Sequence, residues 1–183
     1  MNDDRYRIFT VGSAKDEKFL RKPVPEMDFG SGTKGTLGRK EMAELLRKMR
    51  KTMKAARGVG LSANQIGLPY RLFVAEVPNA QGEPKFYAVA NPVLDKMSGR
   101  KLLEEGCLSV PGVYGNVERA TEVSLRGLDR NGRPLKIKAW GLLAHVFQHE
   151  VDHLNGKLFI DRAKNLRKVP ESERLSEREQ AGL

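Results

Sequence analysis

Two histidines and a glutamate in the last quarter of the chain have the types and spacing of a metal site. His149 and His153 lie four residues apart, with Glu150 beside the first, in an H-E-x-x-H pattern. Residues four apart share one face of a helix, so both imidazoles can bind one divalent metal ion. Glu150 then stands where it can take a proton from a water on that metal. The pattern predicts a metal-dependent hydrolase.

A catalytic site of this kind needs a third protein ligand, and the residues alone offer two sources for it. The one thiol of the chain, Cys107, lies upstream, and a thiolate with two imidazoles suits Zn(II) or Fe(II). Metallopeptidases of the thermolysin type use a downstream ligand instead, and the acidic candidates here are Asp161, Glu171, Glu173, Glu177 and Glu179. His145 continues the four-residue spacing, but about 12 Å of helix rise separates it from His153. We therefore expect His145 in a pocket wall or at the surface.

Two helices are expected to position these groups. The second of them, 141–154, carries the histidines and ends at Asn155 and Gly156. The first has apolar residues at helical spacing at Met42, Leu45, Leu46, Met49 and Met53, and Gly58 is expected to end it. We expect this methionine-rich stripe to be core packing.

The segments between and around the helices predict strands and loops. Residues 1–37 and 58–67 are expected to be irregular, and the charged tail from Arg162 to fray or form a short surface helix. Strands rich in β-branched and aromatic residues are expected near 70–77, 86–94, 121–128 and 133–139, the last two flanking a hairpin signal at 129–132.

This order of elements predicts an α+β fold. We expect a single domain over 1–183, with mixed or antiparallel strands around a central metal-binding helix. The motif-bearing part would cover about 18–160, and 161–183 would be a charged tail.

Composition limits the functional classes. The chain has 183 residues, of which 39% are hydrophobic and 31% charged, as expected for a globular protein and not for general disorder. It contains no apolar run long enough to span a bilayer, and its start carries no secretory or transit signal, so a cytoplasmic location is expected. The single cysteine excludes an internal disulfide, which suits a reducing compartment.

The net charge of +10 is unevenly distributed: the segment from Arg39 to Arg57 contains eight Lys or Arg and only two Glu. A solvated helix face explains this run better than a specific partner does. Weak attraction to a polyanion such as RNA or the ribosome surface is the alternative.

Three segments resemble the motifs of peptide deformylases. Residues 58–65 (GVGLSANQ), 105–109 (EGCLS) and 148–156 (QHEVDHLNG) are similar, in this order, to G-x-G-L-A-A-x-Q, E-G-C-L-S and Q-H-E-x-D-H-L-x-G. The similar stretch runs from about residue 18 to Phe159. Ser62 replaces the first alanine of the first motif, and His145 stands where the family often has an apolar residue or arginine.

The resemblance implies one divalent metal ion held by Cys107, His149 and His153. Fe(II) is the physiological metal it implies, with Zn(II), Ni(II) or Co(II) as substitutes. The implied reaction removes the formyl group from the N-terminal formyl-methionine of new peptides and releases formate. Glu150 would carry the proton, and the Gln65 side chain and the Leu108 backbone N–H would stabilise the developing oxyanion.

The resemblance also implies a methionine pocket and supporting groups around the metal. Val59, Gly60, Val146 and His145 are candidates for the pocket, with Gly60 allowing the substrate backbone to approach closely. Asp152 and Glu105 would orient the ligands, and Arg119 would pair with Glu105.

Two other functions are kept as alternatives. One is an H-E-x-x-H metallopeptidase with its third ligand downstream, and the other is a non-enzymatic, ribosome-associated deformylase-like protein. The expected partners are N-formylmethionyl nascent peptides, with weak ribosome contact through the basic surface. Membrane and sequence-specific nucleic-acid partners are not expected.

Overall fold

The computed structural model describes residues 4–29 and 37–170. The helical elements are α1 (Ala14–Leu20), α2 (Arg39–Ala55), η1 (Ala63–Ile66), α3 (Gly141–Leu154) and η2 (Phe159–Asp161). The strands are β1 (Gly60–Ser62), β2 (Leu72–Pro78), β3 (Pro84–Ser98), β4 (Lys101–Cys107), β5 (Val110–Arg119), β6 (Glu122–Leu128), β7 (Pro134–Trp140) and β8 (Lys164–Lys168).

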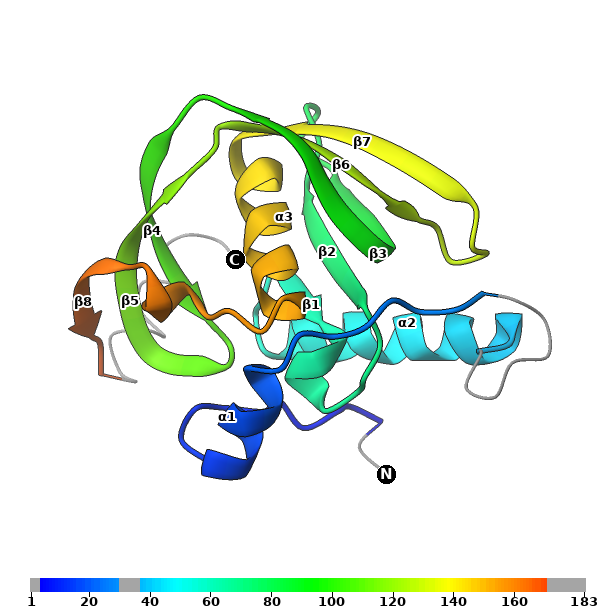
Figure 1. Ribbon diagram of the computed structural model, residues 1–183, viewed down its shortest axis with the longest axis horizontal. Helices are drawn as coiled ribbons and strands as arrows, with labels where there is room; N and C mark the ends of the chain where they lie inside the picture. The colour runs from blue at the N-terminus through cyan, green and yellow to red at the C-terminus, as the bar shows by residue number, and fades with distance from the viewer. Residues whose placement is uncertain (1–3, 30–36, 171–183) are drawn as a thin grey trace.

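The strands form two antiparallel sheets, with α3 between them (Figure 1). One sheet has five strands in the order β1-β2-β3-β6-β7, and the other has three in the order β4-β5-β8. Every strand pairing in the described part is antiparallel. The predicted α+β class is therefore confirmed, with antiparallel strands around the histidine-bearing helix.

The core is packed on both faces of β2. Alternate residues of a strand point to opposite faces of the sheet. Phe73 and Ala75 pack in the apolar cluster that includes α3, and Leu72 and Val74 pack in the cluster that includes α2. Phe147 anchors α3 to the sheet, with its ring 5.5 Å from that of Phe73. The predicted methionine stripe of α2 is buried, so its assignment to the core is confirmed. No helix of the described residues is both long enough and apolar enough to cross a membrane.

The ends of the two long helices differ slightly from expectation. Gly156 has a φ of +71° directly after the Asn155 cap of α3, as the sequence predicts. At the end of α2 the left-handed residue is Arg57, with a φ of +55°, and not Gly58. The Gly58 N–H instead closes the helix by donating to the Met53 carbonyl.

Several expectations from the sequence were incomplete or wrong. The first 37 residues contain α1, which begins at a Ser13 cap, and residues 58–67 contain the short β1 and η1. Strands β4 and β5 were not predicted. The segment after Arg162 forms β8 on the edge of β5 and is neither frayed nor helical, while 171–183 lie outside the described residues.

Candidate metal centre and active site

The structure brings the three predicted metal ligands together. Cys107 Sγ lies 3.1 Å from His153 Nε2, which lies 3.2 Å from His149 Nε2. Within residues 4–29 and 37–170 this is the one group of three such side chains whose ligand atoms all lie within 4.8 Å of one another. The downstream acidic residue Asp161 pairs with Arg21 instead. The other downstream candidates, at 171–179, lie outside the described residues.

These ligands come from different parts of the fold. His149 and His153 share one face of α3, as their spacing predicts. Cys107 ends β4, where the register with β5 shifts so that it lies opposite Val110. The Ser109 N–H donates to Cys107 Sγ at 3.3 Å, which fixes the thiol at the turn between the two strands.

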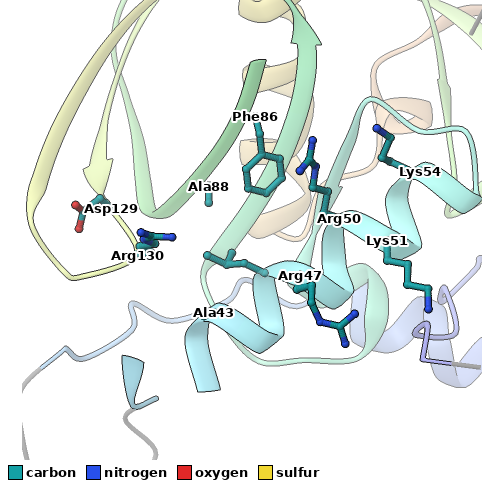
Figure 2. Close-up of a pocket in the computed structure, with 10 residues that line it drawn as sticks. Ala43, Arg47, Arg50, Lys51, Lys54, Phe86, Ala88, Asp129 and Arg130 are labelled. Atoms are coloured by element: carbon teal, nitrogen blue, oxygen red, sulfur yellow. The ribbon is translucent and has the colours of Figure 1, made fainter. Parts of the chain in front are cut away.

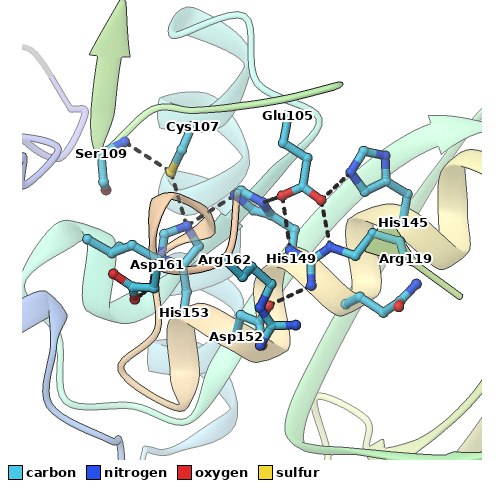
Figure 3. A network of polar contacts seen from close by, with 12 residues as sticks. Glu105, Cys107, Ser109, Arg119, His145, His149, Asp152, His153, Asp161 and Arg162 are labelled. Carbon is cyan, nitrogen blue, oxygen red and sulfur yellow. Dashed lines mark hydrogen bonds and ion pairs between the residues drawn. The ribbon is translucent and has the colours of Figure 1, made fainter. Parts of the chain in front are cut away.

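A buried ion-pair network orients His145 and His149 (Figure 3). His149 Nδ1 lies 3.0 Å from Glu105 Oε2, so in the neutral imidazole this carboxylate accepts the Nδ1 proton and the lone pair stays on Nε2, beside His153 Nε2. Arg119 donates to both oxygens of Glu105, at 2.6 and 3.0 Å, and to Asp152 at 2.6 Å. The predicted pairing of Arg119 with Glu105 is confirmed, and the Asp152 contact joins that pair to α3.

His145 belongs to this network and not to the ligand group. Its Nε2 lies 2.8 Å from Glu105 Oε1, and its side chain is 17% exposed. Its contribution to a substrate pocket stays a prediction, because the described contact is with Glu105.

The donor set fits a divalent metal. Two imidazole nitrogens 3.2 Å apart, with one Nδ1 proton already committed to Glu105, present lone pairs that a shared cation would stabilise. Burial raises the pKa of the Cys107 thiol, but the nearby His153 and His149 outweigh burial and hold that pKa well below its usual value. A thiolate with two imidazoles is a ligand set suited to Zn(II) or Fe(II).

The pKa values of the two buried glutamates shift in opposite directions. Burial raises the pKa of Glu105, but hydrogen bonds from His145, His149 and Arg119 prevail and hold it well below its usual range. For Glu150, burial prevails over the nearby histidines and Ser62 and raises the pKa. A lowered pKa keeps Glu105 charged, so it can hold the imidazoles of His145 and His149 in place. A raised pKa lets Glu150 accept a proton more readily, which suits a role in proton transfer.

Gln65 presents its amide group to the thiol. Its Oε1 accepts the Ser62 N–H at 2.8 Å, which turns Nε2 towards Ser109 Oγ at 3.1 Å and Cys107 Sγ at 3.7 Å. The residue therefore both caps the start of η1 and directs a neutral donor at the ligand group. Leu108 follows Cys107 at the turn, beside a cleft of about 180 Å³ that is lined also by Pro111 and Gly112.

The predicted pocket residues lie mainly in packed surroundings. Val59 and Val146 belong to the apolar cluster between α3 and the five-stranded sheet, and Val146 is only 5% exposed. A Cβ on Gly60 would fall 2.3 Å from Glu150 Oε1, so the carboxylate occupies the space that a side chain there would need. The part of these residues in substrate binding stays a prediction.

Comparison with known proteins matches this arrangement to one family. Residues 11–169 match the family model described as polypeptide deformylase. The chain belongs to the peptide deformylase family. Among relatives, the peptide deformylase of Pelotomaculum thermopropionicum is 46% identical over 164 residues, covering 90% of this chain and 95% of the relative. That of Syntrophomonas wolfei is 51% identical over 158 residues, covering 86% and 93%.

Solved structures of peptide deformylases share the fold. The enzyme from Synechococcus elongatus in complex with actinonin superposes with a TM-score of 0.75 at 31% identity, covering 100% of this chain and 89% of that chain. The Thermus thermophilus peptide deformylase gives 0.73 at 35% identity, covering 97% and 93%. The predicted family is confirmed, and the metallopeptidase and non-enzymatic alternatives are not favoured.

The sequence left two contact residues of this deformylase site without a role. Ser109 lies inside the second motif, and its hydroxyl accepts a hydrogen bond from Gln65. Ser62 replaces the first alanine of the first motif, and its hydroxyl donates to Glu150. The signal for Ser62 was its departure from the family motif. Its contact with Glu150 depends on the packing of β1 against α3.

Proposed function

We propose that this protein is a peptide deformylase that hydrolyses the formyl group from N-formylmethionyl peptides and releases formate. The observation that carries the proposal is that the side chains of Cys107, His149 and His153 come together. Glu150 is buried on α3, the helix that carries both histidines. The match over residues 11–169 supports a single catalytic domain that includes all three motifs.

In the proposed mechanism Cys107, His149 and His153 would hold one divalent metal ion, which would supply Lewis acidity to the site when bound. Glu150 takes a proton from the attacking water and delivers it to the departing amine. Gln65 Nε2 and the Leu108 N–H donate to the oxygen on which charge develops. The oxygen of that water forms a bond to the formyl carbon and the C–N bond of the formyl amide breaks, so the products are formate and a free N-terminal methionine.

We propose Fe(II) as the physiological metal, with Zn(II), Ni(II) or Co(II) able to substitute. The support is chemical, because one thiolate and two imidazoles form a site that suits both iron and zinc. A reducing cytoplasm would keep Cys107 as a thiol or thiolate, in agreement with its unpaired state. Metal analysis of anaerobically purified protein tests this assignment.

The substrate is proposed to lie in the cleft beside Cys107 and Leu108, with Val59, Gly60, Val146 and His145 around the methionine side chain. The support for this pocket is the resemblance to the family motifs and the position of α3 under the ligand group. A membrane or a sequence-specific nucleic acid has no part in the proposal.

Weak ribosome contact through α2 is proposed as a secondary interaction. A cleft of about 730 Å³ lies beside this helix, and its lining includes Phe86, Asp129 and the cationic side chains of Arg47, Arg50, Lys51, Lys54 and Arg130 (Figure 2). Ion pairs reduce their net field, since Arg50 and Lys54 both contact Glu76, and Arg47 contacts Asp4 and Glu44. Such a surface supports weak, salt-sensitive attraction only.

Release of formate from a formyl-Met tripeptide by anaerobically purified, Fe(II)-loaded protein tests the main proposal. Glu150→Ala should keep its metal and lose turnover by about 10²- to 10⁴-fold, the usual contribution of a positioned proton carrier. Metal content is measured on both proteins as the control. A Glu150→Ala protein that remains fast would exclude Glu150 as the proton carrier, and a wild type that releases no formate would exclude the reaction.

A further inference from the structure

Ser62 is a fully buried serine at the end of β1, opposite Phe73 of β2. Ser62 stands at the first alanine of the motif that this segment resembles. Its Oγ lies 2.6 Å from Glu150 Oε2 and 3.1 Å from the Glu150 backbone oxygen. A distance of 2.6 Å is typical of a hydroxyl that donates to a carboxylate.

We propose that Ser62 is a positioning residue that holds Glu150 by Oε2 and thereby directs Oε1 at the reacting groups. The inference rests on the proposed function, in which Glu150 carries the proton. In the described part of the chain the hydrogen bonds to the Glu150 carboxylate all go to Oε2, so Oε1 is the oxygen left for proton exchange.

Packing at Gly60 restricts the same carboxylate from a second side. An added Cβ at Gly60 would fall 2.3 Å from Glu150 Oε1 and 2.9 Å from its carboxyl carbon, so the carboxylate lies directly against the β1 backbone. Gly60 and Ser62 are two residues apart on a strand and face the same side. The strand thus fixes the Glu150 side chain by close packing at one residue and by a hydrogen bond at the other.

The Ser62 hydroxyl lies within hydrogen-bond reach of two oxygens of Glu150, Oε2 of the carboxylate and the backbone oxygen. It therefore ties the side chain of Glu150 to its own backbone, whereas alanine offers neither contact.

The first test is the steady-state kinetics of Ser62→Ala, in Fe(II)-loaded protein with a formyl-Met tripeptide. We expect kcat to fall about tenfold, the value of one hydrogen bond to a charged group, with KM and metal content unchanged. Ser124→Ala is the matched control, because Ser124 is a buried strand serine whose Oγ has no partner in the described structure. A kcat within twofold of wild type, a change confined to KM, or a parallel loss of metal would overturn the proposal.

A second test does not depend on turnover. We expect Ser62→Ala to lower the thermal unfolding midpoint of the metal-loaded protein, and to do so by less than half as much when Glu150→Ala is already present, since the partner carboxylate is then gone. Equal shifts in both backgrounds would mean that Ser62 serves only the backbone, and would overturn the proposal. Absence of formate release by the wild type would refute the proposed reaction while leaving this coupling measurable.

Discussion

Of the two long helices, α2 keeps its charged side chains at the surface, whereas α3 carries Glu150 and His153 into the interior. The buried residues of α2 are methionines, leucines and one threonine. Those of α3 include Gln148, Glu150 and His153 among apolar side chains. Both helices repeat apolar residues with the same period, so periodicity alone does not distinguish them.

The difference lies in what each charged group requires. Exposed ion pairs such as that of Arg47 with Glu44 are screened by solvent and contribute little to stability, so their members can be exchanged at little cost. A buried polar group must have a partner, and on α3 His149 has Glu105, Glu150 has Ser62, and Gln148 bonds both backbone groups of Ala120. The charged residues of α2 therefore lie at the surface and do not each require a specific partner. On α3, each buried polar side chain depends on its own hydrogen-bond partner.

The largest contrast is expected for the metal. Cys107→Ser should reduce both metal content and formate release by more than about 100-fold, because the site loses its thiolate. Lys51→Ala on α2 is the matched control and should leave both unchanged, since Lys51 is exposed and its ammonium group lies near Asp4 and not in the ligand group. Metal analysis beside the formate assay measures the contrast. If Cys107→Ser retains its metal, the third ligand lies elsewhere and the site assignment is wrong.

A smaller contrast is expected for stability. Arg119→Met leaves Glu105 buried without its arginine partner and should cost about 3–5 kcal/mol of unfolding free energy. Arg50→Met, which removes a half-exposed arginine, should cost clearly less, because Lys54 still pairs with Glu76. Denaturant unfolding of the metal-loaded proteins measures both. Similar costs for the two substitutions would remove the distinction between the helices.

The smallest effect is expected for the pH dependence of stability that comes from Glu76, the β2 carboxylate that pairs with Arg50 and Lys54 of α2. Burial raises the pKa of Glu76, but hydrogen bonds from Lys54 and Arg50 prevail and lower it below its ordinary value of 4.5. A lowered pKa means that the unfolded chain binds the proton more readily, so Glu76 stabilises the fold above about pH 4.5 and loses this contribution as pH falls through the folded pKa.

The stability difference between wild type and Glu76→Gln should therefore be full at pH 7 and shrink below about pH 4.5. Thermal unfolding midpoints across this range measure it, and loss of metal in acid affects both proteins alike. A difference that stays constant down to pH 3 would show that the Glu76 charge does not contribute.

Much of the fold was predictable wherever one segment contains its own signal. The apolar period of α3, its Asn155 cap and the hairpin at 129–132 are local, and the structure has them where the sequence indicates. Strands β4 and β5 were missed because glycines and a proline interrupt their apolar pattern. The five exposed residues of β8 form a strand only through pairing with β5, which no local pattern reveals.

The candidate site shows the same division. The residue types and spacing predicted which side chains could meet, and His149, His153 and Cys107 do meet. The sequence could not predict that His145 would contact Glu105, or that Ser62 would contact Glu150, since these pairs are 40 and 88 residues apart. Such contacts depend on how α3 docks between two sheets.

We expect that docking to be a late step of folding. Cys107 belongs to a hairpin of the three-stranded sheet, and His153, 46 residues later, belongs to a helix packed on the five-stranded sheet. Hairpin and helix can each form from neighbouring residues, whereas joining them closes a long loop, which is a slower step. A chain in which the hairpin and the helix have not yet docked thus lacks the complete ligand set. We expect the recovery of metal binding during refolding to report this docking of the β4–β5 hairpin against α3.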